Sequence, residues 1–318
     1  MAWEQAWQEA LYGPHGFYRS PDGPAGHFTT AAHGATGALL ADALLRLARE
    51  NGLRSVVDVG AGRGELLTHL YAACAAAEGP PAPLRLVGVD VVRRPEDLPA
   101  DVEWLPSPGG AALPDELRNL TDALVVAHEW LDVVPCLVAE VADDTTLRER
   151  HVDPATGDES WGPPLAGEAL AWAGEHWFTT TPGDRVEIGL SRDAAWAELL
   201  SRIASGVAVA VDYGHRAGAR PDNGTLTAYR RGHQVDPRPD GTCDLTAHVA
   251  MDSLDHDDLL DQRTALRGLG IRAEPPDHAM ARTDPVGYLR ALERSSAAAA
   301  LTARGGFGDF LWAVKRVG

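Results

Sequence analysis

Three glycines at alternate positions follow a short apolar run in the first fifth of the chain. Residues 56–67 read VVDVGAGRGELL, and the glycines are Gly60, Gly62 and Gly64. Glycine adopts backbone conformations that other residues avoid, so this turn can bring its main chain close to a ligand. The valines before the turn predict a buried strand, and the leucines after it predict a helix. A strand, a glycine turn and a helix form the front of a nucleotide-binding unit.

The spacing of the glycines indicates which type of nucleotide the turn would bind. A dinucleotide fingerprint is G-x-G-x-x-G, whereas this turn reads G-x-G-x-G and has an acid, Asp58, two residues before it. That pattern resembles the first motif of class I S-adenosylmethionine (SAM) methyltransferases. The resemblance assigns the backbone of the three glycines to the methionine part of SAM. Asp58 then contacts the methionine ammonium or orders the loop. The alternative is a glycine-rich turn in another protein with a parallel sheet.

A second acid ends the next predicted strand. Residues 84–90 read LRLVGVD, so Asp90 stands at the carboxyl end of a buried strand. A doubly wound fold places the residue that binds ribose hydroxyls at this point. Asp90 is therefore expected to bind the ribose of the cofactor, and the alternative is an ordinary solvated acid in a turn.

Two carboxylates, an imidazole and an indole follow a third strand. The strand candidate at residues 122–127 (DALVVA) runs directly into HEWLDVVP, which contains His128, Glu129 and Asp132. An α/β enzyme places its chemistry at such strand ends. Glu129 and Asp132 are the predicted catalytic carboxylates. The structural alternatives are a contact to cofactor or loop backbone for Glu129 and a helix cap for Asp132.

Further candidates come from both ends of the chain. Residues 244–254 are predicted to begin a helix, which would put Asp244 and His248 on one face. A carboxylate beside an imidazole could make a base, so His248 is a catalytic candidate; the alternative is a structural hydrogen bond. Asp212 and Tyr213 end another buried strand and could line the pocket. Phe28 and Thr30 could close over the cofactor from the N-terminal side.

The alternation of strands and helices predicts an α/β fold with a Rossmann-like sheet and helices on both faces. Residues 1–52 are expected to form an N-terminal helical segment with a cofactor-covering loop. Residues 53–318 form the predicted methyltransferase domain, with a hairpin and cap insertion at about 138–185.

Composition excludes several kinds of partner. The chain has 28 basic and 46 acidic residues, a net charge of −18, and no basic run, which disfavours nucleic acid and anionic membranes. A cationic substrate would be attracted. No apolar run reaches the ~20 residues of a membrane span. Three scattered cysteines and no metal-ligand spacing support neither disulfides nor a metal site. The cytoplasm is the expected location, and one lysine beside 27 arginines suggests a GC-rich bacterial genome.

Seven motifs in order resemble the MidA-like SAM-dependent methyltransferases, a family that includes mitochondrial complex I assembly factors. They lie between residues 10 and 249, and their sequences are ALYGPHGFYRS, GHFTTA, DVGAGRGEL, HEWLDVVP, VDYGH, GTLTAYRRGH and DGTCDLTAHV. Four positions depart from the family pattern: His27 for Asp, Ala61 for Pro, His128 for Asn and Cys243 for Gln. These changes bear on the substrate more than on the cofactor.

The resemblance implies a protein arginine as the methyl acceptor. A guanidinium offers five donors in a fork, which Glu129 and Asp132 could accept as charge-assisted hydrogen bonds. The predicted function is therefore SAM-dependent methylation of a protein side chain, with arginine favoured. Two alternatives stay open: methylation of a small molecule, and an assembly or scaffold protein that retains the SAM fold with weak or no activity. The oligomeric state is not predicted.

Overall fold

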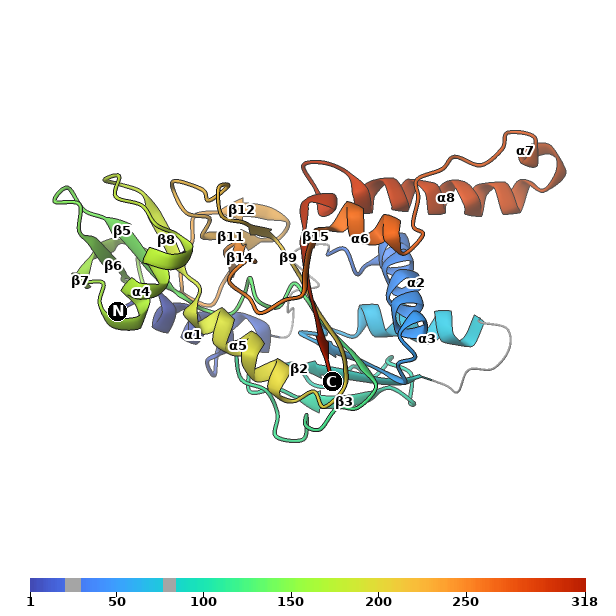
Figure 1. Ribbon diagram of the computed structural model, residues 1–318, viewed down its shortest axis with the longest axis horizontal. Helices are drawn as coiled ribbons and strands as arrows, with labels where there is room; N and C mark the ends of the chain where they lie inside the picture. Colours follow the sequence, from blue (N-terminus) through green and yellow to red (C-terminus); the bar gives the residue numbers. More distant parts are fainter. Residues whose placement is uncertain (21–29, 77–83) are drawn as a thin grey trace.

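A seven-stranded sheet runs through the computed structural model, which describes residues 1–20, 30–76 and 84–318. The strand order is β15-β16-β9-β4-β1-β2-β3, and Figure 1 labels β15, β9, β2 and β3 of this sheet. In chain order the strands are β1 (Ser55–Val59), β2 (Arg85–Asp90), β3 (Glu103–Pro106), β4 (Ala123–His128), β9 (Gly206–Asp212), β15 (Asp258–Asp261) and β16 (Leu311–Val317).

Five of these strands are parallel, and their order reverses at β1. The chain passes from β1 outward through β2 to β3 and then returns to form β4 on the other side of β1. β9 continues parallel to β4, whereas β16 is antiparallel to β9 and β15 to β16. In an open sheet of this kind, ligands bind beyond the carboxyl ends of the strands at the point of reversal. The functional site is thus expected beside the ends of β1 and β4.

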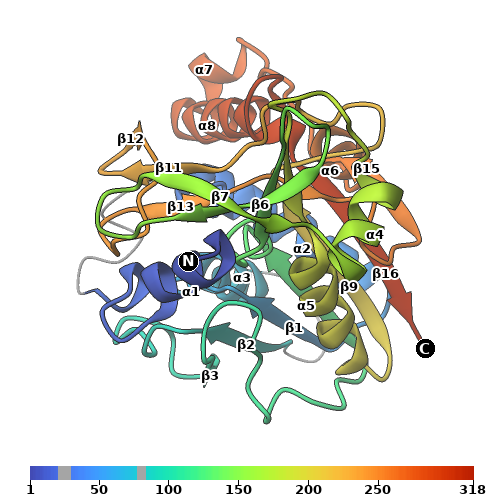
Figure 2. The same cartoon turned by 90° about the vertical axis from the view of Figure 1, so that its left-hand side faces the viewer.

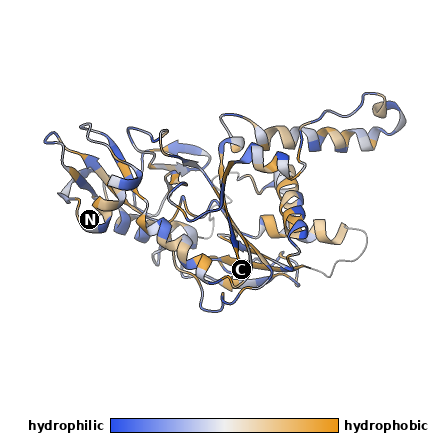
Figure 3. Cartoon of the chain, viewed as in Figure 1, coloured by the Kyte–Doolittle hydropathy of each residue, from blue (hydrophilic) through white to orange (hydrophobic). Residues whose placement is uncertain are grey.

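Helices cover both faces of the sheet, so the predicted α/β fold is confirmed. Along β1, Val56 packs on the face covered by α2 (Gly34–Glu50), α3 (Glu65–Ala76), α6 (Gln262–Gly268) and α8 (Pro285–Thr302). Val57 and Val59 point to the other face, against α5 (Leu190–Ser201). This alternation follows from the two-residue period of a strand. Figure 3 shows the resulting apolar residues along the central strands.

A second, antiparallel sheet lies beyond β4. Its order is β7-β6-β5-β8, built from β5 (Leu137–Val141), β6 (Leu147–Val152), β7 (Glu159–Pro164) and β8 (Arg185–Ile188), with α4 (Gly167–His176) between β7 and β8. Helix α1 (Trp3–Tyr12) packs against this sheet (Figure 2). The indole of Trp3 donates a hydrogen bond to Glu159, and Ala6 packs with Val138. The residues that meet in this contact are far apart in the sequence.

Smaller elements complete the chain. A short 3₁₀ turn, η1 (Phe17–Arg19), follows α1, and another, η3 (Phe307–Asp309), precedes β16. Helix α7 (Met280–Thr283) and the first half of α8 project away from the sheet (Figure 1). Asp284 caps α8 by accepting a hydrogen bond from the amide of Gly287, and Pro285 occupies the first turn. None of the described helices combines the length and apolarity that crossing a bilayer requires.

The helix predicted at residues 244–254 is wrong. Residues Asp244–Thr246 form β13, which pairs with β11 (Thr227–Arg230) in a three-stranded sheet completed by β12 (His233–Val235). Val249–Ala250 form β14, parallel to β10 (Gly214–His215). Asp, Thr and Val are weak helix formers, and pairing with β11 and β10 satisfies the backbone instead.

Candidate active site

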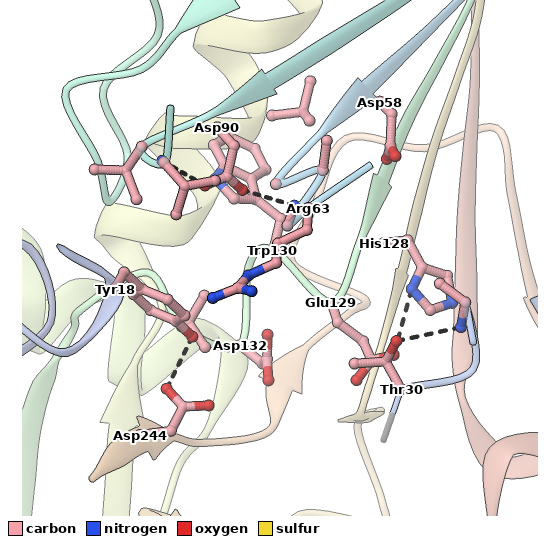
Figure 4. Close-up of a pocket in the computed structure, with 18 of the residues that line it drawn as sticks. Tyr18, Thr30, Asp58, Arg63, Asp90, His128, Glu129, Trp130, Asp132 and Asp244 are labelled. Carbon is pink, nitrogen blue, oxygen red and sulfur yellow. Dashed lines mark hydrogen bonds and ion pairs between the residues drawn. The ribbon is translucent and has the colours of Figure 1, made fainter. Parts of the chain in front are cut away.

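A cavity of about 710 Å³ opens at the carboxyl ends of β1, β2 and β4. The glycine turn, Asp90 and the segment after β4 all line it, although they are separated by up to seventy residues of sequence. Figure 4 shows two groups of acidic side chains in this cavity. Asp58 and Asp90 lie in its upper part, and Glu129, Asp132 and Asp244 lie in its lower part. The strand ends predicted to carry chemistry therefore meet in one place.

The glycine turn has the conformation that its sequence predicts. Gly60, Gly62 and Gly64 have φ angles of 77°, 59° and 77°, in the left-handed region that favours glycine. The amide of Gly60 donates a hydrogen bond to the carbonyl of Val89 at 2.9 Å, which ties the turn to β2. A Cβ on Gly60 would lie 3.1 Å from Cβ of Trp130. The turn is thus held between β2 and the segment after β4.

Asp90 joins the glycine turn to the second strand. Its Oδ2 accepts a hydrogen bond from the amide of Gly62 at 2.8 Å, and its Oδ1 accepts one from the amide of Val92 at 3.0 Å. Each carboxylate oxygen has a further lone pair, so both can still accept hydroxyl donors from a ligand. Burial raises the pKa of Asp90 to about 6, although the two amide hydrogen bonds oppose this.

Asp58 lies deeper, at the end of β1, and only 3 % of its surface is exposed. Burial, together with the negative charges of Asp90 and Glu65, raises its pKa to about 8. A nearby cationic group would favour the ionised form and lower this pKa again. Thr30 also lines the cavity and lies 3.0 Å from Nδ1 of His33. Phe28 and His27 lie outside the described residues.

Glu129 is the first residue after β4 and has an unusual backbone. Its φ angle is 53°, which is uncommon for a residue other than glycine and is often found at functional sites. Its Oε1 lies 3.4 Å from Nδ1 of His128 and has no hydrogen-bond partner among the described residues. Burial, and then the charge of Asp132, raises the pKa of Glu129 to about 8. Burial lowers the pKa of His128 to about 4, so this imidazole is neutral near neutral pH.

Asp132 and Asp244 complete the lower acidic group. Asp132 accepts a hydrogen bond from the hydroxyl of Thr246 at 2.7 Å, and Asp244 accepts one from the hydroxyl of Tyr18 at 2.8 Å. Both carboxyls are at most 4 % exposed. Burial raises the pKa of Asp244 to about 8. Tyr12, Tyr213 and Tyr229 add aromatic surface around these acids.

His248 does not join the cavity. The segment expected to be a helix is β13 and β14, so the four-residue spacing no longer places His248 beside Asp244. The residue is exposed and stacks against the ring of Tyr213, with ring centroids 6.0 Å apart. Asp244 lines the cavity without it. The geometry therefore does not support His248 as a catalytic residue.

Several lining residues, among them Tyr18, Trp130 and Thr246, had no individual role in the site predicted from the sequence. Tyr18 comes from the Gly/Pro-rich N-terminal segment, where only its place in the ALYGPHGFYRS motif could have marked it. Trp130 packs against the glycine turn and donates a hydrogen bond to the carbonyl of Gly110. Thr246 reaches Asp132 only because β13 pairs with β11. No grouping of described residues is suited to hold a metal ion.

Comparison with known proteins agrees with this geometry. A family model described as "Putative S-adenosyl-L-methionine-dependent methyltransferase" matches residues 37–259. The chain is also similar to a crystal structure of a methyltransferase-like protein from Burkholderia thailandensis bound to S-adenosyl-homocysteine, with a TM-score of 0.75 and 23% identity over 99% of this chain and 87% of that chain. A native crystal structure from the same organism and superfamily gives the same values. No curated protein matches the sequence.

Proposed function

The chain belongs to this family of SAM-dependent methyltransferases, and we propose that it methylates a protein side chain, arginine being the favoured acceptor. The enzyme class and the cofactor SAM follow from the family. The acceptor is our proposal, as is the narrower assignment to the MidA-like branch. The observation that carries the acceptor is the group of carboxyls formed by the partly exposed Glu129 and the buried Asp132 and Asp244.

The upper part of the cavity fits the cofactor. SAM supplies an electrophilic methyl group on a positively charged sulfur when it is bound. We propose that the left-handed backbone of Gly60, Gly62 and Gly64 lies against its methionine part, where side chains would obstruct. We propose that Asp90, which two amides orient, accepts the ribose hydroxyls, and that Asp58 contacts the methionine ammonium. Thr30 and Phe28 are proposed to cover the cofactor from the N-terminal side.

The lower part of the cavity fits a guanidinium. This group stays charged near neutral pH and offers five N–H donors in one plane. Glu129 has an unpartnered oxygen, and Asp132 and Asp244 have raised pKa values because they are buried. A guanidinium would let these carboxyls ionise, since an opposite charge favours the charged form. Charge-assisted hydrogen bonds to carboxylate are roughly twice as strong as neutral ones.

Glu129 is the proposed catalytic carboxylate. Transfer of a methyl group to an N–H nitrogen requires that nitrogen to lose a proton, which an ionised Glu129 can accept. The neutral imidazole of His128 lies 3.4 Å from Oε1 of Glu129 and flanks this carboxyl. Asp132 is the neighbouring carboxyl, and the hydroxyl of Thr246 holds it in place by donating a hydrogen bond. Most of the rate gain is expected from positioning, which can supply about 7–11 kcal/mol.

The acceptor can be tested with labelled SAM and three sets of probes: arginine peptides, matched lysine peptides and free guanidino compounds. We expect label on arginine peptides, mapped by mass spectrometry to the side chain, and none on the lysine peptides. The Glu129→Gln variant should lose this label while still binding S-adenosylhomocysteine in calorimetry. Label on lysine peptides alone would contradict the arginine assignment.

Methylation of a small molecule is the second candidate. The burial of the carboxyl side chains favours this candidate, because Asp132 and Asp244 are almost inaccessible from outside the protein. A small guanidino or amino compound could enter more fully than a folded protein. Label that appears only on the free compounds in the same assay would select this candidate. Binding of S-adenosylhomocysteine without label on any probe would instead favour the scaffold alternative.

A further inference from the structure

Two buried carboxyl groups meet behind the cavity. Asp132 lies four residues beyond β4, and Asp212 is the last residue of the neighbouring strand β9. Their exposed fractions are 4 % and 0 %. The two residues are in contact, because the backbone amide of Asp132 donates a hydrogen bond to Oδ2 of Asp212 at 3.3 Å. Only Asp132 lines the cavity, so Asp212 stands behind it.

The hydrogen bonds around this pair leave one carboxyl oxygen of each residue without a partner among the described residues. Oδ2 of Asp212 accepts from the amides of Leu131 at 2.9 Å and Asp132 at 3.3 Å. Oδ2 of Asp132 accepts from Thr246. The two Oδ1 atoms are buried and find no donor among the described residues. Ionised carboxylates only accept, so two of them cannot hydrogen-bond unless one carries a proton. A proton on either carboxyl supplies a donor that this buried pair otherwise lacks.

The surroundings favour this proton. Burial and the negative charges of Asp132 and Glu129 raise the pKa of Asp212 well above its usual range. Arg192 on α5 opposes this, but its guanidinium donates to three backbone carbonyls, those of Asp132, Val134 and His248. Among the described residues, the other titratable groups that face the pair are Glu129 after β4, Asp244 on β13, Tyr213 after β9, Tyr12 on α1 and Tyr18 on η1. Two further cations, Arg63 and Arg231, line the same cavity as Asp132.

We propose that Asp212 is a positioning residue, which holds the segment from Glu129 to Val134 in place through a proton shared with Asp132. This segment carries Glu129 with its left-handed backbone and Trp130, whose side chain lies against Gly60 of the cofactor turn. Loss of the proton leaves two negative charges in contact at low dielectric, where like charges repel strongly. The segment is then displaced, and the cofactor turn loses its support.

The inference uses the family's cofactor and does not depend on the proposed arginine acceptor, so cofactor binding can test it. Calorimetry with S-adenosylhomocysteine should be run from neutral to alkaline pH on the full chain and on Asp212→Asn. If binding needs one retained proton, the association constant falls about tenfold per pH unit above the ionisation of the pair. An asparagine amide donates to Asp132 without a titratable proton, so the association constant of Asp212→Asn should fall less steeply with pH than that of the unmodified chain.

Other carboxyls of the cavity titrate in the same pH range. The pair of Asp132 and Asp212 is therefore reported only by the difference between the binding profiles of the unmodified chain and of the variant. Asp193→Asn is the matched control, because Asp193 is partly buried, accepts from Trp172 and Ser253, and lies outside the cavity. Its profile should follow the unmodified chain. Asp132→Asn is a second variant and should flatten the profile in the same way. Superimposable profiles for the unmodified chain and the folded Asn variants would overturn the proposal.

Discussion

The acidic residues of the cavity differ in how firmly they are oriented. Asp90 has both oxygens fixed by backbone amides, whereas Glu129 keeps one oxygen without a partner. A fixed carboxylate is suited to hold a ligand, and one with a free lone pair is suited to accept a proton. This difference supports our proposal that Asp90 binds the cofactor and that Glu129 takes part in catalysis.

Replacing Asp90 by Ala should weaken binding of S-adenosylhomocysteine about tenfold or more, because ribose hydroxyls lose a charged acceptor and two amides lose their partner. Calorimetry checks this. Asp97→Ala is the control, since Asp97 is an exposed acid after the same strand and does not line the cavity. Equal affinities for the two variants would remove Asp90 from the ribose site.

Glu129 should control the pH dependence of methyl transfer. Its pKa in the free protein is about 8, so the carboxyl is mostly protonated below that pH and ionised above it. A base must be ionised, and therefore kcat/KM should rise as the pH increases through about 8. Glu129→Gln should lower kcat by roughly 100-fold or more and abolish this rise. A rise that persists in the variant would assign it to another group.

Among the elements, the glycine turn between β1 and α3 depends most on local backbone chemistry. Gly64 has a φ angle of 77°, and a Cβ there would lie 2.6 Å from Leu98. Gly64→Ala should destabilise the protein by about 1–2 kcal/mol because of its left-handed backbone. Urea unfolding measures this, and weaker S-adenosylhomocysteine binding should accompany it.

A matched control is available in helix α4. Gly174 lies inside that helix, and a Cβ there would meet nothing within 4 Å. Gly174→Ala should therefore stabilise the protein by about 0.5–1 kcal/mol. If both alanine variants changed stability in the same direction, the backbone argument for the turn would fail.

Strand β13 shows how an element brings the site together. Its pairing with β11 places Asp244 and Thr246 at the cavity, where they meet Tyr18 and Asp132. The sequence suggested a helix that Asp244 or Thr246 could cap, and this helix would have put Asp244 and His248 on one face. Backbone pairing with a distant strand overrides such local signals.

At the scale of the whole molecule, stability should depend on the raised pKa values of the cavity. Asp58, Glu129 and Asp244 have pKa values of about 8 in the folded chain. Below the unfolded pKa of roughly 4 their contribution to stability is complete, and it is lost as the pH rises through about 8. The ligand-free protein should therefore melt at a lower temperature near pH ~8 than near pH ~5.

Thermal unfolding at the two pH values tests this, and the variant Asp58→Asn should reduce the difference because it removes one titrating group. S-adenosylhomocysteine should also raise the melting temperature at both pH values, by mass action. A melting temperature that increased between these pH values would show that the buried carboxyls do not dominate the pH dependence of stability.

The sequence by itself predicted the α/β class, the central strands and the glycine turn between β1 and α3. Val56–Val59 neighbours Gly60, Gly62 and Gly64 in the chain, so periodicity and turn chemistry predict this unit directly. Asp90 and Glu129 follow buried strands, and parallel strands bring their carboxyl ends to one edge. The family resemblance extended this prediction to SAM.

Only the tertiary structure decided the acceptor end. Asp244 and Thr246 reach Asp132 through strand pairing, and Tyr18 reaches Asp244 from 226 residues away. Asp212 meets Asp132 because β9 lies beside β4. These contacts depend on pairing between distant segments, which no local pattern encodes. The raised pKa values likewise come from burial, which exists only once the chain has folded.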